Sequence, residues 1–113
     1  MKNLVGMKIL VVDDDPVIQE LIKNMLAENG YENIQTAGSG EEALEMMKQN
    51  PPDLVVLDIL LPGMQGYEVC RKMRANKATI HIPVLMITGA ALDKDKALEK
   101  VSKPGVQILS PNR

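Results

Sequence analysis

Short uninterrupted apolar runs alternate along the chain with segments whose apolar residues recur at helical spacing. The runs predict strands at 7–12, 33–37, 54–57, 83–87 and 106–109, of which 33–37 carries the weakest signal. Continuously apolar strands favour a parallel sheet that is covered on both faces. With right-handed crossovers, this pattern predicts an open, doubly wound α/β fold.

Four helices are predicted between these strands, and their ends carry recognisable capping residues. The first begins at Asp15 and Pro16 and ends at the Asn29–Gly30 pair, and the second begins with a Ser39 to Glu42 capping box. The third is expected over 66–76 and the fourth over 93–103. No linker, internal repeat or low-complexity tract interrupts this alternation, so residues 1–113 are expected to form one domain.

Composition narrows the function classes. The chain has two aromatic residues and a formal net charge of -2, so neither a base-stacking surface nor a general attraction to phosphate backbones or anionic lipid is expected. A single cysteine excludes an internal disulfide framework, and this favours a reducing, cytoplasmic setting. The apolar runs are too short to span a bilayer, so no membrane association is predicted.

Acidic side chains follow the predicted strands at the points where a doubly wound sheet binds its ligands. Asp13 and Asp14 follow the first strand, Asp58 ends the third and Thr88 follows the fourth. Clustered carboxylates raise one another's pKa, and a hard cation such as Mg²⁺ would relieve their repulsion. Asp58 could then attack a phosphoryl group while Thr88 donates a hydrogen bond to it.

Three other polar or reactive residues have simpler interpretations. Asp15 is expected to cap the first helix, and Cys70 lies on an apolar helical stripe that predicts a core position. His81 stands just before a strand with no acid beside it, which indicates a loop residue rather than a base or a metal ligand.

Several segments resemble the receiver domain of two-component response regulators, a CheY-like family. The resemblance rests on KILVVDDDP, LVVLDILLPGMQGYEVCRKMR and IPVLMITG, at matching spacing, and it extends to about Ala91. It implies a flavodoxin-like, five-stranded parallel sheet of order 2-1-3-4-5 with helices on both faces. It also implies a regulatory phosphoacceptor rather than an enzyme, which takes its phosphoryl group from a histidine kinase or phosphotransfer protein and signals to a downstream protein.

The resemblance assigns a role to each matching position. Asp13 and Asp14 would be the acidic pair for Mg²⁺, with Asp14 the more direct ligand. Asp58 would be both the phosphorylated residue and a metal ligand, and the backbone carbonyl of Leu60 would complete the coordination. Thr88 would be the switch hydroxyl that turns toward the phosphoryl group.

The family's phosphate-pairing lysine has no clear counterpart. Counted without gaps, its position falls on Ser110, which follows the predicted strand at 106–109. Lys103, followed by Pro104, is the alternative, but it matches the family's lysine only if a deletion is accepted. The fifth strand would then be the segment 98–102, which contains charged residues and is a poor buried strand. The ungapped register is therefore preferred, and it also replaces the family's usual aromatic residue on the fifth strand with Gln107.

The family has a fifth helix after this strand, for which the sequence printed here has no counterpart. Without it, apolar sheet surface would need a covering partner, and a second copy of the chain is one candidate. Two other functions compete with the phosphoacceptor. One is a degenerate receiver that only binds proteins. The other is an aspartyl phosphatase, which is disfavoured because Leu60 stands where that class places a second acid.

Overall fold

The computed structural model describes residues 6–59, 61–87 and 106–109, and the side chains within the first two of these ranges. Eight elements follow one another along the chain: β1 (Lys8–Val12), α1 (Pro16–Glu28), β2 (Asn33–Ala37), α2 (Gly40–Gln49), β3 (Leu54–Asp58), α3 (Gly66–Arg74), β4 (Val84–Ile87) and β5 (Val106–Leu109). The helix predicted over 93–103 lies outside the described residues. None of the helices described is long and apolar enough to cross a membrane.

The strands form one sheet in the order β2-β1-β3-β4-β5, as the family resemblance implied. The first four strands pair in parallel, and Val12 of β1 lies beside Leu57 of β3. The carboxyl ends of these four strands therefore meet at one edge of the sheet. This edge is where a doubly wound fold binds its ligands.

The expectation of a fully parallel sheet is wrong for the last strand. β5 pairs antiparallel with β4, with Val106 beside Ile87 and Leu109 beside Val84. An edge strand has one neighbour, which can bond it in either direction, and antiparallel edge strands are common on otherwise parallel sheets. The antiparallel direction places the start of β5 at the edge where β4 ends.

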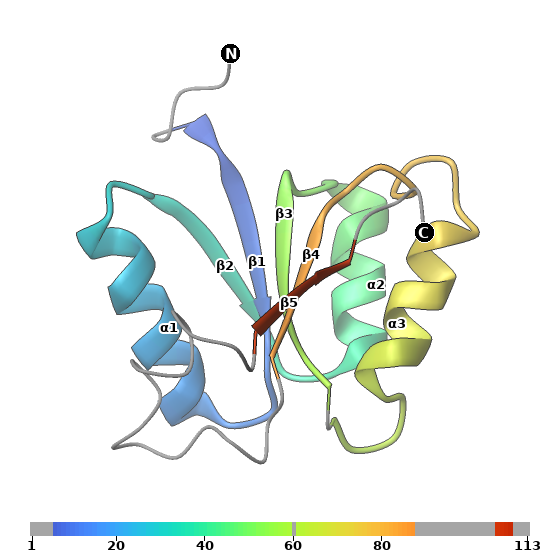
Figure 1. Ribbon diagram of the computed structural model, residues 1–113, viewed down its shortest axis with the longest axis horizontal. Helices are drawn as coiled ribbons and strands as arrows, with labels where there is room; N and C mark the ends of the chain where they lie inside the picture. Colours follow the sequence, from blue (N-terminus) through green and yellow to red (C-terminus); the bar gives the residue numbers. More distant parts are fainter. Residues whose placement is uncertain (1–5, 60, 88–105, 110–113) are drawn as a thin grey trace.

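Helices cover both faces of the sheet, with α2 and α3 on one side and α1 on the other (Figure 1). The larger apolar cluster lies under α2 and α3 and includes the fully buried side chains of Met47, Leu57 and Met73. The smaller cluster lies under α1 and includes Ile18 and Ile22. Cys70 is buried in the larger cluster, which confirms its predicted core position.

Capping explains where the first two helices begin. The Asp15 side chain accepts a hydrogen bond from the backbone N–H of Val17, and Ser39 accepts one from Glu42, so both predicted caps are confirmed. The return bond of the capping box goes one residue further back, because Glu42 accepts from the N–H of Gly38 at 2.8 Å.

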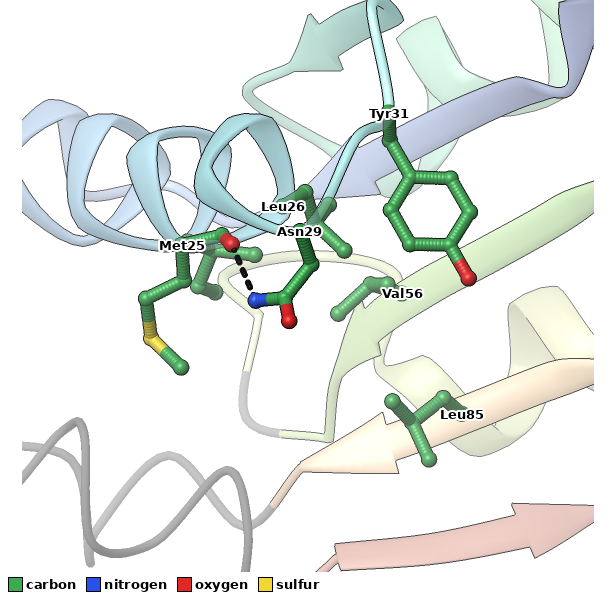
Figure 2. A pocket seen from close by; sticks show the side chains of 7 residues that line it. Met25, Leu26, Asn29, Tyr31, Val56 and Leu85 are labelled. Carbon is green, nitrogen blue, oxygen red and sulfur yellow. Dashed lines mark hydrogen bonds between the residues drawn. The ribbon is translucent and has the colours of Figure 1, made fainter. Parts of the chain in front are cut away.

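The α1 face carries an apolar groove of about 400 Å³ between α1 and the sheet. Met25 and Leu26 line it from α1, Tyr31 from the loop that follows, and Val56 and Leu85 from the strands (Figure 2). In the part of the chain that is described, this face has one helix where the opposite face has two. The predicted covering of apolar sheet surface by a second copy stays a prediction, and this groove is the place where it can be tested.

If a second copy covers this groove, the mass of the protein in solution should rise with concentration. Size-exclusion chromatography with light scattering measures this. Leu85→Lys places a charge in the groove and should give a monomer, whereas Val17→Lys, at an exposed position, should leave the association unchanged. A monomer at every concentration for the parent protein would contradict self-association.

Candidate functional site

The parallel pairing of β1 with β3 brings three carboxylates together. Asp13 directly follows β1, and Asp58 is the last residue of β3, so the two lie at neighbouring positions of adjacent strands. Carboxylate oxygens of Asp13, Asp14 and Asp58 all lie within 4.8 Å of one another. The predicted convergence of the three acids is thus present in the structure, whereas Thr88, which was predicted to join them, lies outside the described residues.

The three acids differ in their exposure to solvent. The side chains of Asp13 and Asp58 are buried, whereas Asp14 is exposed. The pKa of Asp13 is raised from its usual 3.8 to about 7. Burial is the largest cause, the negative charges of Asp58, Asp14 and Asp15 add to it, and the hydrogen bond from the Asp15 N–H opposes it. A buried carboxyl group is thus held among like charges at the end of the sheet.

Backbone hydrogen bonds fix the position of Asp13. Its Oδ1 accepts from the N–H of Asp15 at 2.9 Å, and its own N–H donates to the carbonyl of Ala37 at 3.1 Å. The first bond shapes the turn into α1, and the second extends the β1–β2 pairing by one residue. The carboxyl group is therefore presented by a rigid backbone at the strand end.

Gln19 is a site residue that the sequence analysis missed. Its Nε2 donates to the carbonyl of Asp13 at 2.6 Å and to the carbonyl of Ala37 at 3.2 Å. One α1 side chain thus ties together the carboxyl ends of β1 and β2. The available signal was its place early in the helix that starts at the acidic strand end, where a long polar side chain can reach back to those carbonyls.

Asp58 is held by the sheet and by close contact with α3. The N–H of Ile59 donates to the carbonyl of Ile87 at 3.0 Å, which anchors the end of β3 to β4. The N–H of Gly66 donates to the carbonyl of Ile59 at 2.9 Å. A Cβ atom at Gly66 would lie 2.5 Å from the Asp58 carbonyl oxygen, so only glycine allows this approach.

The donor set fits a hard divalent cation. Three carboxylates offer oxygen ligands within one small volume, the chemistry that Mg²⁺ prefers. The other residues predicted for the site lie outside the described part of the chain: Leu60, Thr88, Lys103 and Ser110. His81 is exposed on a turn before β4, which agrees with its interpretation as a loop residue.

The family model for the response regulator receiver domain matches residues 9–109. The chain belongs to this family. It is 41% identical over 101 residues to the chemotaxis protein CheY-3 of Vibrio cholerae, a match that covers 89% of this chain and 76% of that protein. Receiver domains are regulatory phosphoacceptor domains, and the order of the strands and the parallel pairing of the first four agree with the fold that the resemblance implied.

Longer proteins also contain a similar domain. The transcriptional regulatory protein PhoP of Bacillus subtilis is 45% identical over 91 residues, which cover 80% of this chain but 37% of that protein. Among solved structures, a receiver domain from Methanoculleus marisnigri superposes with a TM-score of 0.70 at 45% identity and covers 83% of this chain and 76% of that chain. Vibrio cholerae CheY4 superposes with a TM-score of 0.69 at 29% identity, covering 94% and 90%.

The raised pKa of Asp13 predicts a pH-dependent stability in the metal-free receiver. Between pH 3.8 and about 7 the folded state binds more protons than the unfolded state, so the free energy of unfolding contributed by Asp13 falls as pH rises. The slope is at most about 1.4 kcal/mol per pH unit. Urea unfolding in the presence of a chelator measures it, and Asp13→Asn should remove it. An equal slope in that variant would contradict the prediction.

Gln19→Met should weaken Mg²⁺ binding. The variant keeps the length of the side chain but loses both hydrogen bonds, and the Asp13 backbone is freed to move. We expect the dissociation constant for Mg²⁺ to rise by about three- to tenfold, because small displacements of ligands weaken metal sites. Amide NMR shifts followed during a Mg²⁺ titration measure this constant.

Gln49→Met is the matched control, because Gln49 is exposed and its side chain bonds only Glu45 among the described residues. Its Mg²⁺ affinity should equal that of the parent protein. If Gln19→Met loses stability but keeps its Mg²⁺ affinity, Gln19 has a structural role only.

Proposed function

We propose that this receiver domain takes a phosphoryl group from the phosphohistidine of a histidine kinase or phosphotransfer protein onto Asp58, with Mg²⁺ held by Asp13, Asp14 and Asp58. The observation that carries the proposal is the approach of these three carboxylates to within 4.8 Å at the carboxyl end of the parallel strands. The phosphorylated domain would then present a changed face to a downstream protein.

In the transfer, one carboxylate oxygen of Asp58 attacks phosphorus, and the phosphorus–nitrogen bond of the donor breaks. The imidazole leaves with the electron pair of that bond and is protonated. Bound Mg²⁺ would supply positive charge that offsets the charge on the transferring phosphoryl group. The protein supplies position: the bond of Ile59 to β4 and the contact with Gly66 hold Asp58 in place before the donor arrives.

The acidic pair has two parts in this proposal. The exposed Asp14 would be the more direct ligand, because its carboxylate is accessible to a cation that keeps part of its water shell. Asp13 would bind as its ionised form, and its pKa of about 7 means that cation binding near neutral pH is coupled to loss of its proton. Mg²⁺ affinity should therefore rise with pH through this region.

The other predicted contributors stay predictions. These are the Leu60 carbonyl as a ligand, Thr88 as the switch hydroxyl, and Lys103 or Ser110 at the position of the phosphate-pairing lysine. The direction of β5 bears on the ungapped register, since Leu109 lies beside Val84 and the carboxyl end of β5 is at the edge of the sheet away from Asp58.

The second candidate function is a degenerate receiver that only binds proteins, and the cluster of carboxylates disfavours it. A chain used only for protein binding has no need to keep three acids in mutual repulsion at a buried strand end. We further propose that the chain assists only the phosphorylation and dephosphorylation of its own aspartate and catalyses no other reaction. Its partners would be proteins rather than nucleic acid.

Acetyl phosphate with Mg²⁺ tests the proposal directly. Intact mass spectrometry should show the addition of one phosphoryl group to the parent protein. Asp58→Asn removes the attacking carboxylate and should show none. Omission of Mg²⁺ should slow the labelling of the parent protein by at least about tenfold, since the charge of the transferring group is then not offset.

Asp53→Asn is the matched control, because Asp53 precedes the same strand at its opposite end and its side chain accepts from the Lys8 backbone N–H. An asparagine keeps that acceptor, so this variant should be labelled like the parent. A parent protein that gains no mass and shows no NMR shifts with beryllofluoride would favour the degenerate receiver. Labelling that persists in Asp58→Asn would assign the phosphoryl group to another residue.

A further inference from the structure

A second groove lies between α2 and α3, away from the acidic site. Its volume is about 430 Å³, and its apolar lining is formed by Leu44 and Met47 from α2 and Ala78 from the loop after α3. Both helices run from the edge of the sheet that carries Asp58 toward the opposite edge (Figure 1). The groove lies near their carboxyl ends, because Lys48 and Lys72 line it. We name this feature the α2–α3 groove.

The wall of the α2–α3 groove after α3 is held rigidly. The Thr79 hydroxyl donates to the carbonyl of Met73 at 2.7 Å and is buried. Arg74 Nη1 donates to the carbonyls of Ile80 at 3.2 Å and Ile82 at 2.9 Å. These bonds tie the loop between α3 and β4 to the end of α3, so the groove is formed before any partner binds.

The polar groups that line the groove are rich in donors. Lys48 and Lys72 contribute ammonium groups. The Asn76 side chain accepts from the Ala78 N–H with its oxygen, and its two N–H donors bond no other described residue. The Thr79 hydroxyl proton is already engaged. Lys72 forms no ion pair with any described residue, and Lys48 has an exposed one with Glu45 at 3.8 Å, which is weak. The lining therefore complements a ligand that brings acceptors.

The α3 side of the groove belongs to a basic segment, although the chain is acidic overall and α2 carries Glu41, Glu42 and Glu45. No acidic residue occurs from 69 to 92, and this stretch contains Arg71, Lys72, Arg74 and Lys77. Arg71 and Lys77 are exposed, and each adjoins in sequence a residue that lines the groove. Some of these cations also complement the carboxyl end of α3, but that role needs one or two of them rather than four.

We propose that the α2–α3 groove docks an acidic protein segment that carries an aliphatic side chain between carboxylates. The aliphatic side chain would contact the partly exposed Leu44 and the exposed Ala78, whereas Met47 is almost fully buried and belongs to the core beneath them. The carboxylates would meet Lys48, Lys72 and the Asn76 amide. The proposal is independent of phosphorylation at Asp58. A nucleic acid is the poorer fit, because no aromatic side chain lines the groove and a phosphate chain would leave its apolar lining uncovered.

The probe is a blocked hexapeptide of sequence Asp-Glu-Leu-Leu-Asp-Glu, titrated into ¹⁵N-labelled protein at constant ionic strength. Amide shifts should concentrate at the groove residues on α2 and on the loop after α3. In titrations repeated at higher salt concentrations, the affinity of the peptide should be lower. Lys72→Glu should raise the dissociation constant by about tenfold or more, because a cation that faces the carboxylates becomes an anion. Replacement of both leucines in the peptide by alanine should weaken binding by about three- to tenfold.

Lys23→Glu is the matched control, since Lys23 is exposed on α1 and the variant makes the same change in net charge. It should bind the peptide like the parent protein, and Lys72→Gln serves if Lys72→Glu does not fold. Equal weakening by Lys23→Glu and Lys72→Glu would show general charge attraction and overturn the proposal. Equivalent shifts with inorganic phosphate or with a short oligonucleotide at the same concentration would also overturn it, because the groove would then be an anion or nucleic-acid site.

Discussion

The rest of the site depends on the parallel pairing of β1 with β3, which places two aspartates side by side at the ends of neighbouring buried strands. Desolvation penalises the ionised form of the buried Asp13, and the neighbouring acids add to that penalty. The fold holds this unfavourable arrangement with the bond from the Asp15 N–H, the pairing of Asp13 with Ala37 and the two bonds from Gln19. Two buried apolar clusters on opposite faces of the sheet hold the strands themselves in register.

Much of this arrangement follows from local sequence signals. The runs around Val11 and Val56 are apolar without interruption because both faces of these strands are buried, and this distinguishes them from half-exposed strands. Once those strands are placed, the positions of Asp13 and Asp58 follow from the geometry of a parallel sheet. The caps at Asp15 and Ser39 were equally predictable, because each needs only a side-chain oxygen and an N–H two or three residues away.

Other features depend on contacts that no local pattern encodes. The direction of β5 is one, because a short apolar edge strand bonds its single neighbour equally well in both directions. Gln19 is another, since its partners include Ala37, 18 residues along the chain. The α2–α3 groove is lined by residues of two helices and a loop. The lack of acidic residues from 69 to 92 therefore indicates a binding surface only once the fold places Lys48 and Lys72 in the same groove. The third helix also ends at Arg74, earlier than predicted, because the Asn76 side chain forms a turn with Ala78 instead of continuing the helix.

The glycine at the start of α3 has a mechanical consequence. Between most packed elements, side chains can rotate and absorb a small movement of one backbone relative to another. At Gly66 the backbone of α3 lies directly against the backbones of Asp58 and Ile59, with no side chain between them. A displacement of the β3 end therefore cannot be absorbed at this contact, and strand and helix must move there as one body.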